Sequence, residues 1–116
     1  MSRASSSGAA APPVRDAAPL FAALGDETRL RLLIRLSSGG PGSITQLSAK
    51  SDVTRQAITK HLRVLAAAGV VRSSRRGRER VWDLEPKRLS DAQAYLERIS
   101  QQWDSALDRL RAFVEG

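Results

Sequence analysis

The chain has 116 residues, which is enough for one small domain and leaves no room for a second. Its 19 lysine and arginine residues against 12 aspartate and glutamate residues give a formal net charge of +7, which favours a polyanionic partner, with nucleic acid as the first candidate. The absence of cysteine excludes disulfides, thiolate metal sites and cysteine nucleophiles, and no apolar run approaches the roughly 18 residues of a membrane span, so we expect a soluble cytoplasmic protein without a membrane partner.

The N-terminal stretch, residues 1–15, is rich in Ser, Ala, Gly and Pro, and its apolar content is too small and too weakly patterned to order it. We therefore expect a disordered tail over 1–15 and a single folded domain over 16–116. A signal peptide is not expected here, because Ser and Gly residues interrupt the only apolar segment.

Two helices are predicted next, one from Asp16 to near Gly25 and one from near Asp26 to Ser37, where SSGGPG ends it. Each aspartate is expected to cap its helix by accepting hydrogen bonds from backbone amides. In the first helix, Leu20, Phe21 and Leu24 share one side, and this face needs a packing partner. In the second helix, the side chains expected to point inward are Leu30, Leu33, Ile34 and Leu36. The second helix also carries arginines at positions 29, 31 and 35, which we interpret as a solvated face and do not assign to DNA.

A helix-turn-helix is predicted in the middle of the chain. Ser43 is the expected cap of a third helix, ITQLSAKS, whose Ile44 and Leu47 point inward. Residues 51–53 form a short turn into Thr54, the expected cap of a fourth helix over 54–68, and Gly69 ends that helix. So short a connection forces the two helices to cross steeply. The fourth helix should therefore protrude, while the third lies across a phosphate backbone.

The fourth helix has two unlike faces. Its apolar face comprises Ile58, Leu62 and Leu65, and its polar face comprises Gln56, Thr59, Lys60 and Arg63. Amide, hydroxyl and cationic groups can hydrogen-bond to base edges and phosphates in a major groove. Arg55 and Gln56, in the first turn, are our first choices for base contact, because a guanidinium pairs with guanine and an amide with adenine.

Two short strands follow, VVRSSRR and GRERVWDL, joined by a turn around Gly77, and they predict a wing. The wing contains five arginines, and the only acidic residue among them is Glu79. The arginines are Arg72, Arg75, Arg76, Arg78 and Arg80. We favour a phosphate contact as the reason for this charge; the alternative is that it protects an exposed strand edge from pairing with another chain. Val81 and Leu84 are expected to anchor the second strand to the core, with Trp82 partly covering it.

The last segment, residues 86–115, is predicted to be one long helix with apolar residues three and four apart. This apolar stripe consists of Leu89, Ala92, Leu96, Ile99, Trp103, Ala106, Leu110 and Phe113. A compact winged domain of this size cannot cover the whole stripe, so we expect a symmetric dimer through the first and last helices. The alternative is that both helices fold back on their own domain. The predicted dimer contacts are Leu20, Phe21, Leu24, Leu96, Ile99, Trp103, Leu110 and Phe113.

The stretch LFAALGDETRLRLLIRL, followed by TQLSAKSDVTRQAITKHLRVLAAAGVV and a basic wing, resembles the ArsR/SmtB family of bacterial winged-helix repressors. The resemblance covers roughly residues 17–84, and its most specific parts are GDETRLRLL and ITKHLRVL. It implies a mainly α winged helix-turn-helix fold with a small β-hairpin, in the order α-α-α-α-β-β-α. It also implies a homodimer that binds an inverted repeat near its own promoter and represses transcription.

The chain departs from the family pattern at the metal sites. Many members sense metals through a cysteine pair in the third helix, or through carboxylate and histidine ligands on the terminal helix. Neither set is present here, so the sequence resembles a metal-independent branch. The single histidine, His61, lies at the edge of the packed face of its helix, and we interpret it as a helix-flank or phosphate-contacting residue rather than a metal ligand.

The sequence thus predicts a sequence-specific DNA-binding transcriptional regulator with no metal or cofactor; whether a small-molecule inducer acts on it is left open. The predicted DNA contacts are Ser43, Thr45, Gln46, Thr54, Arg55, Gln56, Thr59, Lys60, His61, Arg63, Arg75, Arg76 and Arg78. An enzyme is not expected, because the chain has no glycine-rich phosphate loop and no serine with a plausible base. Two alternatives stay open: a protein-interaction module that uses the stripe or the wing, and a nonspecific architectural DNA binder.

Overall fold

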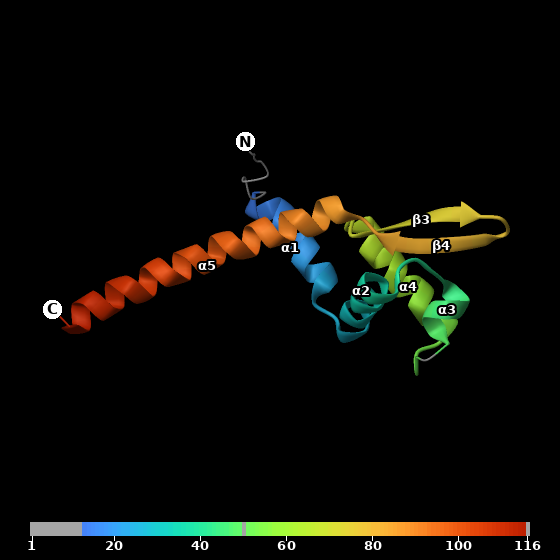
Figure 1. Ribbon diagram of the computed structural model, residues 1–116, viewed down its shortest axis with the longest axis horizontal. Coiled ribbons are helices and arrows are strands. Elements are labelled where there is room, and N and C mark those ends of the chain that lie inside the picture. Colours follow the sequence, from blue (N-terminus) through green and yellow to red (C-terminus); the bar gives the residue numbers. More distant parts are fainter. Residues whose placement is uncertain (1–12, 50, 116) are drawn as a thin grey trace.

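The computed structural model describes residues 13–49 and 51–115, and over this part of the chain it is mainly helical with a small antiparallel sheet (Figure 1). The elements are α1 (Val14–Leu24), α2 (Glu27–Gly39), β2 (Gly42–Ser43), α3 (Ile44–Ser48), α4 (Arg55–Ala67), β3 (Val71–Arg76), β4 (Glu79–Leu84) and α5 (Pro86–Glu115). This arrangement confirms the predicted winged helix-turn-helix. None of the described helices is both long enough and apolar enough to cross a membrane.

The start of α1 differs from the prediction. Residues 1–12 of the expected tail lie outside the described residues, but Val14 and Arg15 already belong to α1. The helix begins after Pro13, and Asp16 sits inside its first turn without a capping hydrogen bond. Pro13 is the N-cap residue of α1, and its carbonyl accepts hydrogen bonds from the Asp16 and Ala17 N–H groups without any side-chain cap.

The other three predicted caps are confirmed. The Asp26 carboxylate accepts a hydrogen bond from the Arg29 N–H at 3.0 Å, and the Thr54 hydroxyl accepts one from the Ala57 N–H at 3.1 Å. Ser43 begins α3 with a reciprocal pair of bonds: its hydroxyl accepts from the Gln46 N–H, and its own N–H donates to the Gln46 side chain. These bonds satisfy backbone amides that the first helical turn leaves without partners.

The core lies between the helices and the sheet. Its buried side chains are Leu20, Leu32, Leu36, Leu47, Ile58, Leu62, Leu65, Val70, Val71, Trp82 and Ala92. The apolar face predicted for α4, Ile58 with Leu62 and Leu65, is fully buried. All four helices before the wing therefore contribute to one apolar centre.

The inward face of α2 was predicted only in part. Leu36 is buried and Leu33 packs half-buried against the core, as predicted. Leu30 is 45% exposed and Ile34 65% exposed, however, and the buried Leu32 was not predicted. The run LRLLIRL is apolar on more than one side, so its pattern alone does not determine which stripe packs. The helix also continues two residues beyond Ser37, to Gly39.

The sheet has the strand order β2-β4-β3, so β4 is the central strand and β2 is a third strand beyond the predicted hairpin. Gly42 pairs with Trp82 and Ser43 with Val81. Trp82 is buried in the core rather than partly covering it, while Val81, on the opposite face of the strand, is half-buried. Gly77 turns the hairpin with a φ of +63°, a left-handed value that glycine adopts without strain.

Helix α5 lies across α1 near its beginning and then projects away from the domain (Figure 1). Ala92 is buried and Leu89 is half-buried, but every residue from Leu96 to Glu115 is exposed. A helix of 30 residues is about 45 Å long, so its outer half extends well beyond the other elements. The wing, α3 and α4 gather at the opposite end of the molecule (Figure 1).

Candidate nucleic-acid interface

The outward face of α4 presents the polar side chains that the sequence predicted for it. Arg55, Gln56, Lys60 and Arg63 are exposed, and no described carboxylate forms an ion pair with any of these three cations. Thr59 is half-buried, and its hydroxyl donates to the Arg55 carbonyl at 2.9 Å. The face therefore combines exposed cations and an amide with a hydroxyl already bonded to the helix backbone.

A shallow hollow of about 740 Å³ lies on this face, between the start of α3 and the first two turns of α4. It is lined by Ile44, Thr54, Arg55, Gln56, Ala57, Thr59, Lys60 and Arg63. Six of these residues carry a polar or cationic group, and Thr45 and Gln46 are exposed on the neighbouring helix. The surface suits a ligand that presents hydrogen-bonding edges beside negative charge, as a duplex groove does.

Two residues predicted to contact DNA lie elsewhere. Ser43 is only 6% exposed, and its hydroxyl accepts the capping hydrogen bond that begins α3. His61 faces the start of α2, on the opposite side of α4 from Thr59 and Arg63. The His61 side chain therefore lies on the flank of α4 next to α2 and not on the outward face.

His61 belongs to a cluster with Asp26 and Arg29. The Arg29 Nη1 lies 3.2 Å from His61 Nδ1, its Nε donates to the Ala23 carbonyl at 2.6 Å, and His61 Nδ1 lies 3.8 Å from Asp26 Oδ2. The pKa of Asp26 is lowered from its ordinary value, chiefly by the hydrogen bond from the Arg29 N–H and further by the charges of Arg29 and His61. Arg29 was predicted to belong to a solvated face, but instead it links α1, α2 and α4.

The wing carries exposed positive charge at its tip. Arg72 forms an ion pair with Glu85 at 3.1 Å, and Arg80 donates to the Ser73 hydroxyl at 2.8 Å. Arg75, Arg76 and Arg78 are exposed, and none of the described carboxylates pairs with them. The three arginines predicted to contact DNA are therefore the ones whose guanidinium groups are available for an external anion.

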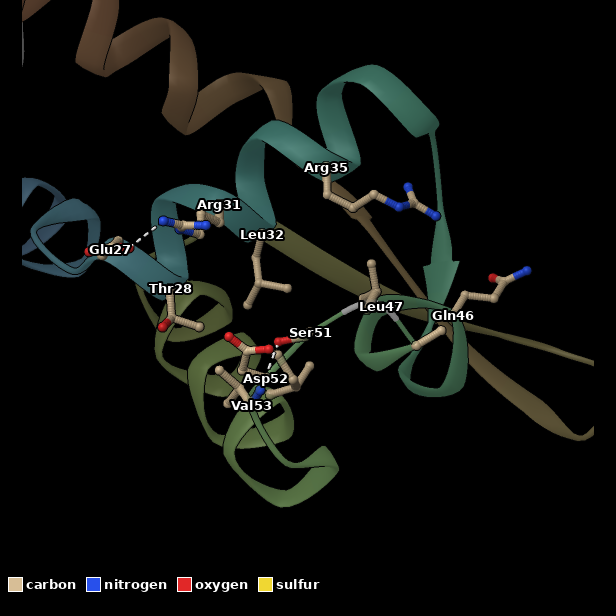
Figure 2. Close-up of a pocket in the computed structure, with 12 residues that line it drawn as sticks. Glu27, Thr28, Arg31, Leu32, Arg35, Gln46, Leu47, Ser51, Asp52 and Val53 are labelled. Atoms are coloured by element: carbon tan, nitrogen blue, oxygen red, sulfur yellow. Dashed lines mark hydrogen bonds and ion pairs between the residues drawn. The ribbon is translucent and has the colours of Figure 1, made fainter.

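A second hollow, of about 610 Å³, lies behind the helix-turn-helix and was not identified from the sequence (Figure 2). Leu32, Leu47 and Ile58 form its apolar wall, and Arg35 and Gln46 stand near its rim. Arg31 points toward Glu27, its ion-pair partner, in the same view. This hollow shares no lining residue with the one on the outward face of α4, so the two surfaces are separate.

The apolar residues predicted for a dimer lie on two elements. On α5, Leu96 is 54% exposed, Trp103 64%, Leu110 59% and Phe113 83%, and Ile99 is exposed beside them. Leu107 and Val114 widen this stripe and were missed, although both follow a predicted residue by four positions. On α1, Phe21 and Leu24 are half-buried and Phe21 packs against Tyr95 of α5, whereas Leu20 is fully buried in the core of its own chain. Leu20 is therefore not available to a partner.

Comparisons with known proteins agree on the kind of protein this is. A family model described as a helix-turn-helix domain matches residues 24–74. The chain is 35% identical over 85 residues to the HTH-type transcriptional regulator Rv2034 of Mycobacterium tuberculosis, which covers 73% of this chain and 76% of that protein. It is 43% identical over 68 residues to YuzN of Bacillus subtilis, named an uncharacterized HTH-type transcriptional regulator, covering 53% of this chain and 74% of that protein. A solved ArsR-like transcriptional regulator from Rhodococcus sp. RHA1 matches with a TM-score of 0.72 and 37% identity, covering 85% of this chain and 92% of that one.

Proposed function

Since this chain belongs to the ArsR family of winged helix-turn-helix, DNA-binding transcriptional regulators, we propose that it acts as a homodimeric repressor of an inverted-repeat operator near its own promoter. Proteins of this family are transcriptional regulators and not enzymes, in agreement with the expectation from the sequence. The observation that carries the proposal is the outward face of α4, with its unpaired cations and the amide of Gln56 beside a basic wing.

The proposed base contacts come from the first turn of α4. The Thr54 cap sets the direction of this turn, and Arg55 and Gln56 follow it directly on the exposed side. In helix-turn-helix proteins the N-terminal residues of the second helix reach the base edges. Arg55 then pairs with a guanine and Gln56 with an adenine, while Lys60 and Arg63 neutralise phosphates.

The proposed contacts with the flanking backbone come from α3 and the wing. Thr45 and Gln46 are exposed at the start of α3, and the wing tip adds Arg75, Arg76 and Arg78. Contacts of this kind fix the register of the protein on the duplex without reading its sequence. They also make the affinity depend on salt, because each neutralised phosphate releases counterions.

The proposed dimer uses the exposed stripe of α5 and the half-buried side chains Phe21 and Leu24 of α1. Five large apolar residues of α5 between Leu96 and Phe113 were predicted to meet a partner, and all five are exposed in the single chain. A two-fold dimer covers such a surface with the same surface of a second copy. It also places two reading helices on two half-sites, which is why the operator is proposed to be an inverted repeat.

The experiment that tests this function is a titration of labelled DNA from upstream of the protein's own gene, beside a scrambled duplex, at about 150 mM salt. We expect tight binding to the native fragment alone, saturating at two subunits per site. The Gln56→Ala variant should lose about 1–3 kcal/mol of discrimination between the two duplexes, because it removes one base-edge pair.

The outcomes separate the alternatives. Equal weak binding of the wild-type protein to both duplexes would favour a nonspecific DNA binder, and no binding to either would favour a protein-interaction module. An equal loss by Gln56→Ala on both duplexes would remove Gln56 from base reading while leaving the regulator itself in place. Repression is tested separately, by placing the bound fragment before a reporter gene with and without the protein.

A further inference from the structure

Arg88, the third residue of α5, joins three helices through one guanidinium group. Its Nε donates to the Ala68 carbonyl at the end of α4 (3.3 Å), and its Nη2 donates to the Asp16 carbonyl in the first turn of α1 (3.1 Å). Its Nη1 forms an ion pair with Asp91 on α5 at 2.9 Å, which holds the group in place. The two helices proposed to form the dimer and the helix proposed to read DNA therefore meet at one side chain.

Arg88 completes the C-terminal end of α4. The last turn of α4 contains no basic residue, and the N–H groups of Gly69 and Val70 donate to the Ala66 and Leu65 carbonyls, whereas the Ala68 carbonyl at the C-cap accepts its hydrogen bond from Arg88. A cation at a helix C-terminus is stabilised by the helix dipole and can bond to these carbonyls. Arg88 supplies that cation from a different element, so α5 is tied to α4 by both charge and hydrogen bonding.

Gly69 makes the room for this contact. Its φ is +82°, and a Cβ at this position would lie 2.8 Å from the Cγ of Arg88. Glycine is therefore required here twice, once to end α4 in the left-handed region and once to let the Arg88 stem pass. The arginine itself is 27% exposed beside an open hollow, so its replacement removes no buried core side chain.

We infer that Arg88 is a positioning residue for operator binding, which sets the angle between the reading helix α4 and the dimer helix α5. Arg88 contacts the C-terminal end of α4, about 18 Å along the helix axis from Gln56, so it does not contact the bases itself. A tilt of about 10° around that end moves the first turn of α4 by about 3 Å, close to the ~3.4 Å rise of one base pair.

This inference rests on the proposed dimer, and it predicts an effect on spacing rather than on general affinity. Two reading helices must enter grooves one helical turn apart, about 34 Å. If Arg88 fixes their separation, the protein discriminates between operators whose half-sites differ in spacing by one base pair. Without the guanidinium, α4 can adjust its angle, and that discrimination weakens.

The experiment compares Arg88→Met with the wild-type protein on three duplexes: the operator located by footprinting, and versions with one base pair added or removed between the half-sites. Methionine keeps an aliphatic stem next to Gly69 and removes the guanidinium. The matched control is Arg98→Met, which removes the same charge from an exposed position of the same helix. Sedimentation and thermal unfolding of each variant establish that the dimer and the fold are intact.

For the wild-type protein and Arg98→Met we expect a preference for the native spacing that is the same within twofold. For Arg88→Met we expect this preference to shrink by at least about fivefold, the lower end of a typical coupling between two sites. If the methionine variant unfolds, Arg88→Lys keeps the cation at the end of α4 but cannot span the same three acceptors, and it should show the same loss of spacing preference.

Unchanged spacing preference in the folded Arg88 variants would overturn the inference, and so would an equal loss of affinity on all three duplexes. A wild-type protein that binds as a monomer, or without spacing preference, would instead overturn the proposed homodimeric function. The two failures are therefore distinguishable in the same series of titrations.

Discussion

Asp26 both caps α2 and lies next to cationic groups, and both of these features lower the pKa of its carboxyl group. It caps α2 through the Arg29 N–H, and it lies between the Arg29 guanidinium and the His61 ring, which belongs to α4. A carboxylate that accepts a backbone hydrogen bond next to positive charge favours its ionised form. The cluster thus links the cap of one helix to the inner side of the reading helix.

The stability of the folded chain should depend on pH through this residue, and Asp26→Asn tests the dependence. The folded pKa lies below the unfolded value of about 3.9, so the carboxylate stabilises the fold above that pH, and this contribution is lost as the pH falls through the lowered pKa. Asparagine caps a helix about as well as aspartate, so the helix start is retained. Urea unfolding should show a wild-type advantage at pH 6 that becomes smaller as the pH falls below about 4.

The control for this measurement is Asp104→Asn, which removes a carboxylate from the exposed outer half of α5. A difference between wild type and Asp26→Asn that is the same at pH 6 and pH 3 would show that the carboxylate charge contributes nothing there.

At the scale of single residues, local chemistry was predictable and long-range direction was not. Thr54 and Asp26 are caps because of what lies within three residues of them, which the sequence displays directly. His61 and Arg29 are 32 positions apart in the chain, and the sequence around either residue does not indicate that the two are in contact. Ser43 was predicted correctly as a cap, but its burial was not predicted, because that burial depends on the pairing of Gly42–Ser43 with β4.

The wing is the element whose charge has the simplest consequence. Its tip arginines at positions 76 and 78 are exposed, whereas Arg72 of the same strand is paired with Glu85. Replacing Arg76 and Arg78 together by Ala should weaken binding to every duplex and reduce the slope of log K against log salt by about two units, if each arginine neutralises one phosphate. Titrations between about 50 and 200 mM salt measure that slope.

The matched control is Arg72→Ala, which removes an arginine of the same hairpin that already has an internal partner. It should leave the slope nearly unchanged. A double variant with the wild-type slope would refute phosphate contacts by the tip and leave edge protection as the role of these arginines.

At the scale of elements, the sequence predicted which segments are helices and strands better than how they pack. The caps, Gly69 and Gly77 were sufficient to delimit α4 and the wing. Strand β2 was not predicted because it has only two residues and forms only by pairing with Trp82 and Val81, which are distant in the sequence. The burial of Leu32 in place of Leu30 was missed for a related reason, because the two leucines are equally apolar and only the neighbouring elements determine which of them is packed.

At the scale of the whole molecule, the exposed apolar stripe of α5 is the feature that indicates an assembly of two chains. The apolar residues Leu96, Trp103 and Leu110 recur every seven positions and stay exposed where α5 leaves the domain (Figure 1). A heptad repeat of this kind is typical of a helix that packs against another along its length. The length of the stripe was readable from the sequence, but the point at which α1 stops covering it was not.

Trp103→Glu tests whether this stripe holds two copies together. Trp103 is 64% exposed in the single chain, so glutamate is harmless to a monomer but introduces an unpaired charge into the proposed interface. An unpaired buried charge costs about 3 kcal/mol or more, which corresponds to roughly a hundredfold weaker dimer. Gln101→Glu adds the same charge to the opposite side of α5 and is the control. In sedimentation velocity runs at micromolar concentration, Trp103→Glu should be monomeric and the control dimeric, and operator affinity should fall only in the monomeric variant. A Trp103→Glu protein that stays dimeric would move the interface away from α5, and a monomeric one with full operator affinity would show that DNA binding does not require the dimer.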